Sequence, residues 1–390
     1  MAVNKRENER RKRKEEKNKK RNKTLWVLII IAVAVIVIMK VSEVDFSGLL
    51  VGVKNQTDIS EKVSDEAFPY KLDSGDKTIL SVMGSKLSIL NDLSYSVINS
   101  SSAQELIKDN HSYANPVIRV SGGYSVIIDQ GSNVYRLDSS SENIYENSVD
   151  GKILCADVSD TGVIALATVS GIQKSTVTAY SKSLNQKMSY EVSGGYITSL
   201  AIDDRGRNVA FTVLSSDNAK IKSTIYTMSV NDPQPRSEFT YTNSSVLDLH
   251  FVSNNVYVVG TDFVSVISSL TKEVKVYEQG SINTVSYYFN PADNLVIAFN
   301  DYTGAASSKI AYIQQNGKIK TQLDVNAEVK DITASGTEMT ILTSSEVISY
   351  KISTGKETSR AAVDDSYTDI QQVSSKVFGK HLSYLELIND

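Results

Sequence analysis

A repeat of about 40 residues constrains the fold of this chain more than any other feature. In eight segments an apolar run, a tight polar turn and a second apolar run follow one another, most clearly in Ile153–Val169 and Ile197–Val213. The turns lie at Gly84, Gly123, Gly162, Gly206, Asn254, Asp293, Gly336 and Ser375, at spacings of 39, 39, 44, 48, 39, 43 and 39 residues. This period is typical of the four-stranded blades of a β-propeller.

A second hairpin follows the first in each repeat and supplies the other two strands of a blade. VTAYSKSLNQKMSYE and IAYIQQNGKIKTQL are examples, and Asn316-Gly317 in the latter predicts a type I′ turn. In the Asp-Thr-Gly and Asp-Arg-Gly turns we expect Asp to accept backbone hydrogen bonds and Gly to supply a positive φ. Ser102–Lys108 is the best helix candidate, and it is short. The sequence therefore predicts an all-β propeller of eight four-stranded blades, with seven blades as the alternative.

The two ends of the repeat region indicate how the ring closes. Fifteen residues follow Ser375, which is enough for two more strands but leaves the last blade without its outer strand. Ala67–Asp73 (AFPYKLD) precedes the first full repeat and is predicted to supply that strand. Pairing the two chain ends would remove exposed sheet edges.

The N-terminal part has the pattern of a membrane anchor. Leu25–Met39 is apolar on all sides, and with its flanks the segment 24–41 predicts one transmembrane helix. A cleaved signal peptide is the alternative, but Lys40-Val41-Ser42-Glu43-Val44 contains no small-x-small cleavage pattern. The sequence thus predicts a basic tail at 1–23, the helix at 24–41, a stalk at 42–66 and a propeller at 67–390.

Charge divides the chain sharply at this segment. Residues 1–23 carry twelve Lys and Arg against four Glu, whereas the chain from Val41 onward carries 28 basic against 41 acidic residues. The positive-inside rule places the basic tail in the cytoplasm, where it would contact anionic lipid, and the propeller outside the plasma membrane. The acidic propeller argues against nucleic acid as a partner. An outer domain with one cysteine and hence no disulfide suits a bacterial envelope.

Residues that usually mark catalytic or metal sites are sparse and scattered. Cys155 lies in an apolar run and is expected to pack as a small hydrophobe. His111, His250 and His381 have no ligand partners at metal-site spacing. The pairs Asp203-Asp204 and Asp364-Asp365 are expected to be solvated turn residues, and the strand tyrosines to be packing residues. The sequence therefore predicts no catalytic, cofactor-binding or metal-ligating residue and no cofactor.

Two propeller families share turn patterns with this chain. Val347–Arg360 (VISYKISTGKETSR) resembles the hairpin of quinoprotein-type repeats, and the Asp-x-Gly turns resemble those of WD-repeat propellers. The sole tryptophan, Trp26, lies in the predicted anchor, so the docking tryptophans of quinoprotein blades are absent. The whole plan is similar to an uncharacterised family of membrane-anchored propeller proteins of clostridial Gram-positive bacteria. That resemblance implies the fold and the anchor and no known activity.

Three functions remain open at this point. The first is a binding or scaffolding module that presents its loops to envelope proteins or cell-wall components. The second is a transmembrane sensor with a propeller input domain, which would need a cytoplasmic partner. The third is a propeller enzyme, such as a quinone-dependent dehydrogenase or a glycan-cleaving enzyme, which would need acids or a cofactor pocket in the central channel. Sparse catalytic residues favour the first.

Overall fold

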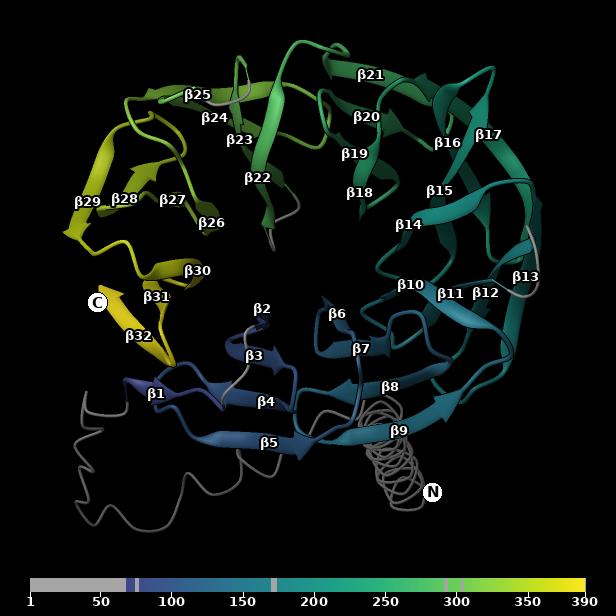
Figure 1. Cartoon of the computed structure of the whole chain (residues 1–390), viewed down its shortest axis with the longest axis horizontal. Coiled ribbons are helices and arrows are strands. Elements are labelled where there is room, and N and C mark those ends of the chain that lie inside the picture. The colour runs from purple at the N-terminus through teal and green to yellow at the C-terminus, as the bar shows by residue number, and fades with distance from the viewer. Residues whose placement is uncertain (1–67, 74–76, 170–173, 291–293, 303–304, 390) are drawn as a thin grey trace, which may run out of the picture. The chain divides into compact units, whose positions relative to one another are not determined.

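Eight four-stranded antiparallel sheets form the blades of a ring (Figure 1). The computed structural model describes residues 68–73, 77–169, 174–290, 294–302 and 305–389, all within one compact unit, Val63–Asp390. The prediction of an all-β propeller with eight four-stranded blades is confirmed, and the seven-blade alternative is wrong. None of the described residues forms a helix that could span a membrane. The predicted tail, transmembrane helix and stalk lie outside the described residues.

The first four blades contain strands of 6 to 11 residues. Blade 1 is β2 (Thr78–Met83), β3 (Lys86–Asn91), β4 (Ser94–Asn99) and β5 (Glu105–Asn110); blade 2 is β6 (Pro116–Ser121), β7 (Tyr124–Asp129), β8 (Val134–Ser139) and β9 (Asn143–Ser148). Blade 3 is β10 (Lys152–Val158), β11 (Ile164–Val169), β12 (Lys174–Tyr180) and β13 (Gln186–Ser193); blade 4 is β14 (Tyr196–Ile202), β15 (Asn208–Asp217), β16 (Lys220–Ser229) and β17 (Asp232–Thr242).

The other four blades follow the same plan, and the last one takes a strand from the start of the ring. Blade 5 is β18 (Val246–Val252), β19 (Asn255–Gly260), β20 (Val264–Ser268) and β21 (Lys272–Tyr277); blade 6 is β22 (Asn283–Asn290), β23 (Asn294–Asn300), β24 (Ser308–Ile313) and β25 (Ile319–Val325). Blade 7 is β26 (Asp331–Ser335), β27 (Glu338–Leu342), β28 (Glu346–Lys351) and β29 (Glu357–Ala362); blade 8 is β30 (Tyr367–Val373), β31 (Lys376–His381), β32 (Tyr384–Asn389) and β1 (Tyr70–Lys71).

The strand order gives the ring two different faces. In each blade the first strand lies nearest the centre and the fourth at the rim (Figure 1). Because the strands alternate in direction, the turns between strands one and two and between strands three and four lie on one face, here called the turn face. The connector face lies opposite and carries the connections between blades and the turns between strands two and three. Among the described residues, the turns between strands two and three cover 92–93, 130–133, 218–219, 261–263, 301–302, 305–307, 343–345 and 382–383.

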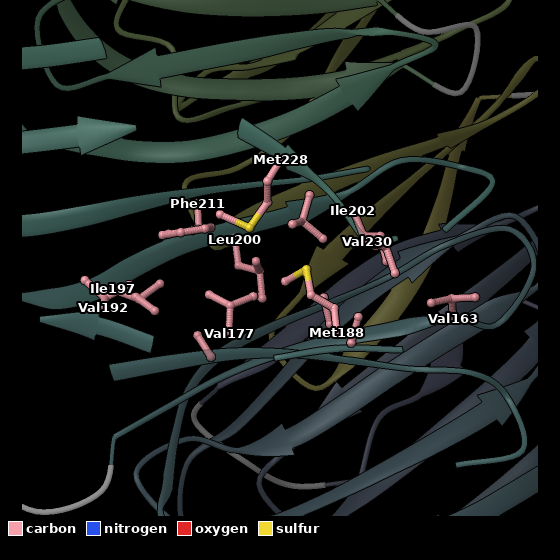
Figure 2. Packing of buried hydrophobic residues seen from close by; sticks show 14 of the residues in the cluster. Val163, Val177, Met188, Val192, Ile197, Leu200, Ile202, Phe211, Met228 and Val230 are labelled. Atoms are coloured by element: carbon pink, nitrogen blue, oxygen red, sulfur yellow. The ribbon is translucent and has the colours of Figure 1, made fainter. Parts of the chain in front are cut away.

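The hydrophobic core consists of eight clusters, and each lies between two successive blades. Figure 2 shows the cluster between blades 3 and 4, where Val177 and Met188 of one blade pack against Leu200, Phe211 and Met228 of the next. Each sheet is therefore buried on both sides. This explains why second strands such as β11 (IALATV) are almost continuously buried and apolar rather than alternating.

Ring closure follows the predicted pairing of the two chain ends. β1 pairs antiparallel with β32 through Tyr70↔Leu385 and Lys71↔Tyr384. The Leu72 N–H donates to Ser383 O at 2.8 Å, and the Leu72 side chain is 3% exposed. The prediction for this segment is confirmed for its described part, which supplies the outer strand of blade 8.

The expected helix at Ser102–Lys108 is wrong. This segment leads into strand β5, which pairs with β4 through Val97↔Ile107. The Ile107 side chain is buried against blade 2, whereas its neighbour Lys108 is exposed. Packing against the next blade thus overrides a weak local helix propensity.

The Asn316-Gly317 turn also differs from the expectation. Only Gly317 of this pair has a positive φ, 78°, whereas a type I′ turn needs two such residues. The Gly317 N–H donates to Gln314 O at 2.8 Å, and the register of β24 and β25 shifts at Ile313. The hairpin therefore has a longer loop that ends in a glycine bulge. A type I′ geometry occurs instead at Asn218-Ala219, where φ is 50° and 61°.

Candidate functional site

The first strands of the blades enclose a cavity of about 370 Å³ in the centre of the ring. It is lined by aromatic side chains of β18 and β22 and by a small set of polar side chains. Ser121 and Asp204 at its lining place it toward the turn-face ends of these strands. The polar set consists mainly of Arg119, Asp157, Asp204, Asp248, His250 and Gln371.

An ion pair crosses this central region. Arg119 of blade 2 donates from both terminal nitrogens to Asp248 of blade 5, at 3.0 and 2.8 Å. The Asp248 side chain is 3% exposed, whereas that of Arg119 is 44% exposed toward the cavity. The Tyr287 hydroxyl donates to the same carboxylate at 3.4 Å. The attraction of Asp248 raises the pKa of the Arg119 guanidinium. Burial lowers that pKa, but its effect is the smaller of the two. The guanidinium is therefore a fixed cation whose fork is occupied.

Two other carboxylates join neighbouring blades through the backbone. Asp157 Oδ2 accepts the Ile202 N–H at 2.8 Å, and Asp331 Oδ2 accepts the Ile370 N–H at 2.9 Å. In both cases the donor belongs to the first strand of the next blade, whose inner edge has no partner strand and whose N–H groups need acceptors. Burial raises the pKa of Asp157 to about 7 and that of Asp331 to about 6.

The cysteine and the histidines are not grouped. Burial raises the pKa of the Cys155 thiol to about 12, which suppresses the reactive thiolate. His250 stacks on Phe289 with ring centroids 4.3 Å apart, and burial lowers its pKa to about 4. His111 contacts Asn91 O at 2.9 Å, and His381 lies beside Glu386. Among the described residues, no three His, Cys, Asp or Glu side chains are close enough to hold a metal ion.

The acid pairs of the turns have divided roles. Asp203 is 3% exposed, and its Oδ1 accepts the N–H groups of Arg207 and Asn208, so the expectation of a solvated residue is wrong for Asp203. Its neighbour Asp204 lines the cavity. Asp364 and Asp365 are exposed, and Asp365 forms an ion pair with Lys330 at 2.6 Å.

Exposed apolar side chains gather on the connector face. Eleven large apolar side chains of the described residues are exposed, and only two lie on the turn face: Leu184, in the turn between β12 and β13, and Ile319, at the start of β25. The other nine occupy connector-face turns or the first three residues of first or third strands. They are Ile79, Leu93, Tyr196, Ile221, Leu247, Val285, Tyr302, Leu382 and Tyr384. We call this set the apolar connector set.

Blade 4 has a long hairpin that extends at the connector face. Its strands β15, β16 and β17 have 10, 10 and 11 residues, and pairing of β15 with β16 continues to Asp217↔Lys220, beyond the start of β14. A groove of about 550 Å³ lies between this hairpin and the connection from blade 3, lined by Tyr196 and Ile221. Gly195 at its floor has φ 99°, and a Cβ there would lie 2.6 Å from Leu214 O. The backbone conformation of this connection thus requires glycine.

Part of this surface depends on β-bulges that turn signals do not predict. The first strands of five blades shift register against their second strands, for example between Val246 and Asp248 and between Thr284 and Ser286. The extra residues in these two blades, Leu247 and Val285, are exposed members of the apolar connector set. The breaks in apolar alternation at these places are the only signal in the sequence.

Solved structures with the same fold are numerous. The computationally designed protein Ika8 matches with a TM-score of 0.57 at 12% identity, covering 82% of this chain and 98% of that chain. Sqt1 from Saccharomyces cerevisiae matches with a TM-score of 0.57 at 12% identity, covering 83% and 98%. The C-terminal WD40 domain of Sif2 matches with a TM-score of 0.54 at 11% identity, covering 82% and 99%. At these identities the likeness concerns the fold alone, and it confirms the WD-repeat resemblance at that level.

Comparison with curated proteins gives no match. A family model does match, however, over residues 68–381, which is more than half of the chain and nearly all of the ring. The matched range begins with the strand that closes blade 8 and ends with β31. The chain therefore belongs to the family of unknown function DUF5711.

Proposed function

We propose that this protein is a membrane-anchored, extracytoplasmic binding or scaffolding module that docks envelope proteins or cell-wall components on its connector face. The concentration of the apolar connector set on one face carries this proposal. Nine of the eleven exposed large apolar side chains of the described residues lie on this face, and such an uneven distribution of exposed apolar surface favours an interaction site there. Tyr302 and Leu382 are 66% and 67% exposed, too accessible to contribute to the core.

The construction of the ring suits this role. Loops at the face of a propeller vary without disturbing strands that are fixed between neighbouring blades. Anchoring would also raise the effective concentration of the module near the bilayer.

The proposed placement predicts a protease pattern. Protease added to intact protoplasts should remove a C-terminal tag and leave a tag before Met1 intact, because the basic tail remains in the cytoplasm. Reversing the charges of Arg10–Lys14 should lower the fraction with this orientation, as measured by the same assay. Protection of the C-terminal tag in intact protoplasts would refute the placement.

Capture of a partner should depend on the connector face. Crosslinking in native membranes, followed by purification of the chain, should yield one or a few envelope components. The double variant Tyr302→Ser/Leu382→Ser should reduce their yield at least tenfold, because each substitution removes exposed apolar surface without touching the core. Changes within 215–220 or 301–307, whose described residues lie at the connector face, should have the same effect.

Matched controls come from the turn face. Leu184 and Ile319 are 38% and 40% exposed, so Leu184→Ser and Ile319→Ser make similar polar changes there. Capture should persist in this double variant, and both double variants should keep the wild-type melting temperature. Equal loss of capture in the two would contradict docking through the connector face.

A further inference from the structure

We propose that the central cavity binds an organic cation, a guanidinium or ammonium group, between Asp157 and Gln371. This site is separate from the apolar connector set, because the cavity lies toward the turn-face ends of the first strands. It also does not depend on whether the connector face docks a partner.

Two side chains of the cavity lining, Gln371 and Asp157, have oxygen atoms that can accept further hydrogen bonds. Gln371 Oε1 is buried without a hydrogen-bond donor. Asp157 accepts from the backbone N–H groups of Ile202 and Val158, and no side chain in the described part of the chain donates to it. Both fork nitrogens of Arg119 already donate to Asp248. A ligand that completes the site must therefore bring hydrogen-bond donors of its own.

Charge and shape favour a cation among such donors. Arg119 and Asp248 form a neutral pair, so the Asp157 carboxylate makes the lining negative when it is ionised. Tyr287, Tyr288 and Phe289 line the same cavity, and aromatic faces attract cations. A volume of about 370 Å³ admits a small molecule or one long side chain of a partner. Both sources offer the same chemistry.

Protonation of Asp157 should compete with the cation. Burial raises the pKa of Asp157 to about 7. Arg119, Asp248 and Cys155 interact electrostatically with its carboxylate, and Asp204, Tyr287 and His250 line the same cavity. Burial holds His250 neutral, with a pKa of about 4, and burial raises the pKa of Cys155 to about 12. Binding that requires the Asp157 carboxylate should thus tighten about tenfold from pH 6 to pH 8.

Calorimetry on the full-length chain in detergent tests this site. The probes are agmatine, the neutral analogue butylurea, and the peptide Gly-Gly-Arg-Gly-Gly. Agmatine or the peptide should bind at pH 8, and the tighter of the two identifies a free molecule or a partner side chain as the source. Asp157→Asn should weaken binding at least tenfold and abolish its pH dependence, and Gln371→Leu should weaken it severalfold.

The matched control is Asp331→Asn. Asp331 makes the same backbone contact to the next blade as Asp157 but does not line the cavity. This variant should bind within twofold of the wild type and keep the pH dependence. The proposal is overturned if butylurea binds as tightly as the cations, if neither cation binds, or if Asp331→Asn loses as much affinity as the cavity variants. Should Asp157→Asn fail to fold, Gln371→Leu and the pH series still decide the question.

Discussion

Deletion of residues 68–73 is expected to lower the free energy of unfolding of the full-length chain by about 5 kcal/mol or more. The deletion removes the outer strand of blade 8 and exposes the edge of β32. It also removes Phe68, which packs on Phe378 at 5.0 Å, and the buried Leu72 side chain from the cluster between blades 8 and 1. Urea unfolding followed by circular dichroism measures the effect.

Point variants separate ring closure from a general loss of outer-strand residues. Leu72→Ala creates a cavity at a side chain that is 3% exposed and should lower stability by about 3 kcal/mol. Ile319→Ala makes a comparable change on the outer strand of blade 6, where the side chain is 40% exposed, and should change stability by less than about 1 kcal/mol. An unchanged urea midpoint after the deletion would show that this strand does not close the ring.

Arg119→Met is expected to lower stability by about 3–5 kcal/mol, because it leaves the buried Asp248 carboxylate without its counter-ion. The stability that Arg119→Met loses relative to the wild type should be smaller at pH 5 than at pH 8. An unpaired buried carboxylate has a folded-state pKa above its unfolded value, so stability is present at low pH and is lost as pH rises through that pKa. Urea midpoints at the two pH values measure the difference.

A second substitution should restore much of this stability. Arg119→Met/Asp248→Leu replaces both charges by apolar groups and should recover most of the loss. Lys275→Met breaks an exposed pair, in which Lys275 Nζ lies 2.9 Å from Glu278, and should leave the urea midpoint nearly unchanged. If Arg119→Met alone is as stable as the wild type, the ion pair across the central cavity does not stabilise the ring.

The repeat pattern predicts most of the fold because its signals are local. Gly84, Gly206 and Gly336 supply a positive φ in the tight turn of the first hairpin of their repeats. The apolar runs on both sides of each turn indicate sheets that are buried on both faces. Closure through Tyr70 could be predicted by counting strands. The prediction of a helix at Ser102–Lys108 is wrong because the local sequence does not indicate that the next blade buries Ile107.

The central cavity and the connector face could not be predicted in the same way. Arg119 and Asp248 are 129 residues apart, and only closure of the ring brings them into contact. Leu247 and Val285 are exposed because register shifts at bulges reorient them. Asp157 lies near the end of an apolar run, where the sequence does not distinguish it from other polar residues at strand ends. Its contact with the next blade depends on the N–H group of Ile202. These features arise from contacts between repeats rather than from the repeat itself.

Docking through the connector face is tested most directly by site-specific photocrosslinking in intact cells. A photoreactive residue placed singly at Tyr302, Leu382, Leu184 or Ile319 samples two exposed positions on each face. We expect discrete adducts of higher mass from positions 302 and 382, with the same partner in both, and none from positions 184 and 319. Adducts confined to 184 and 319, or equal from all four positions, would contradict it.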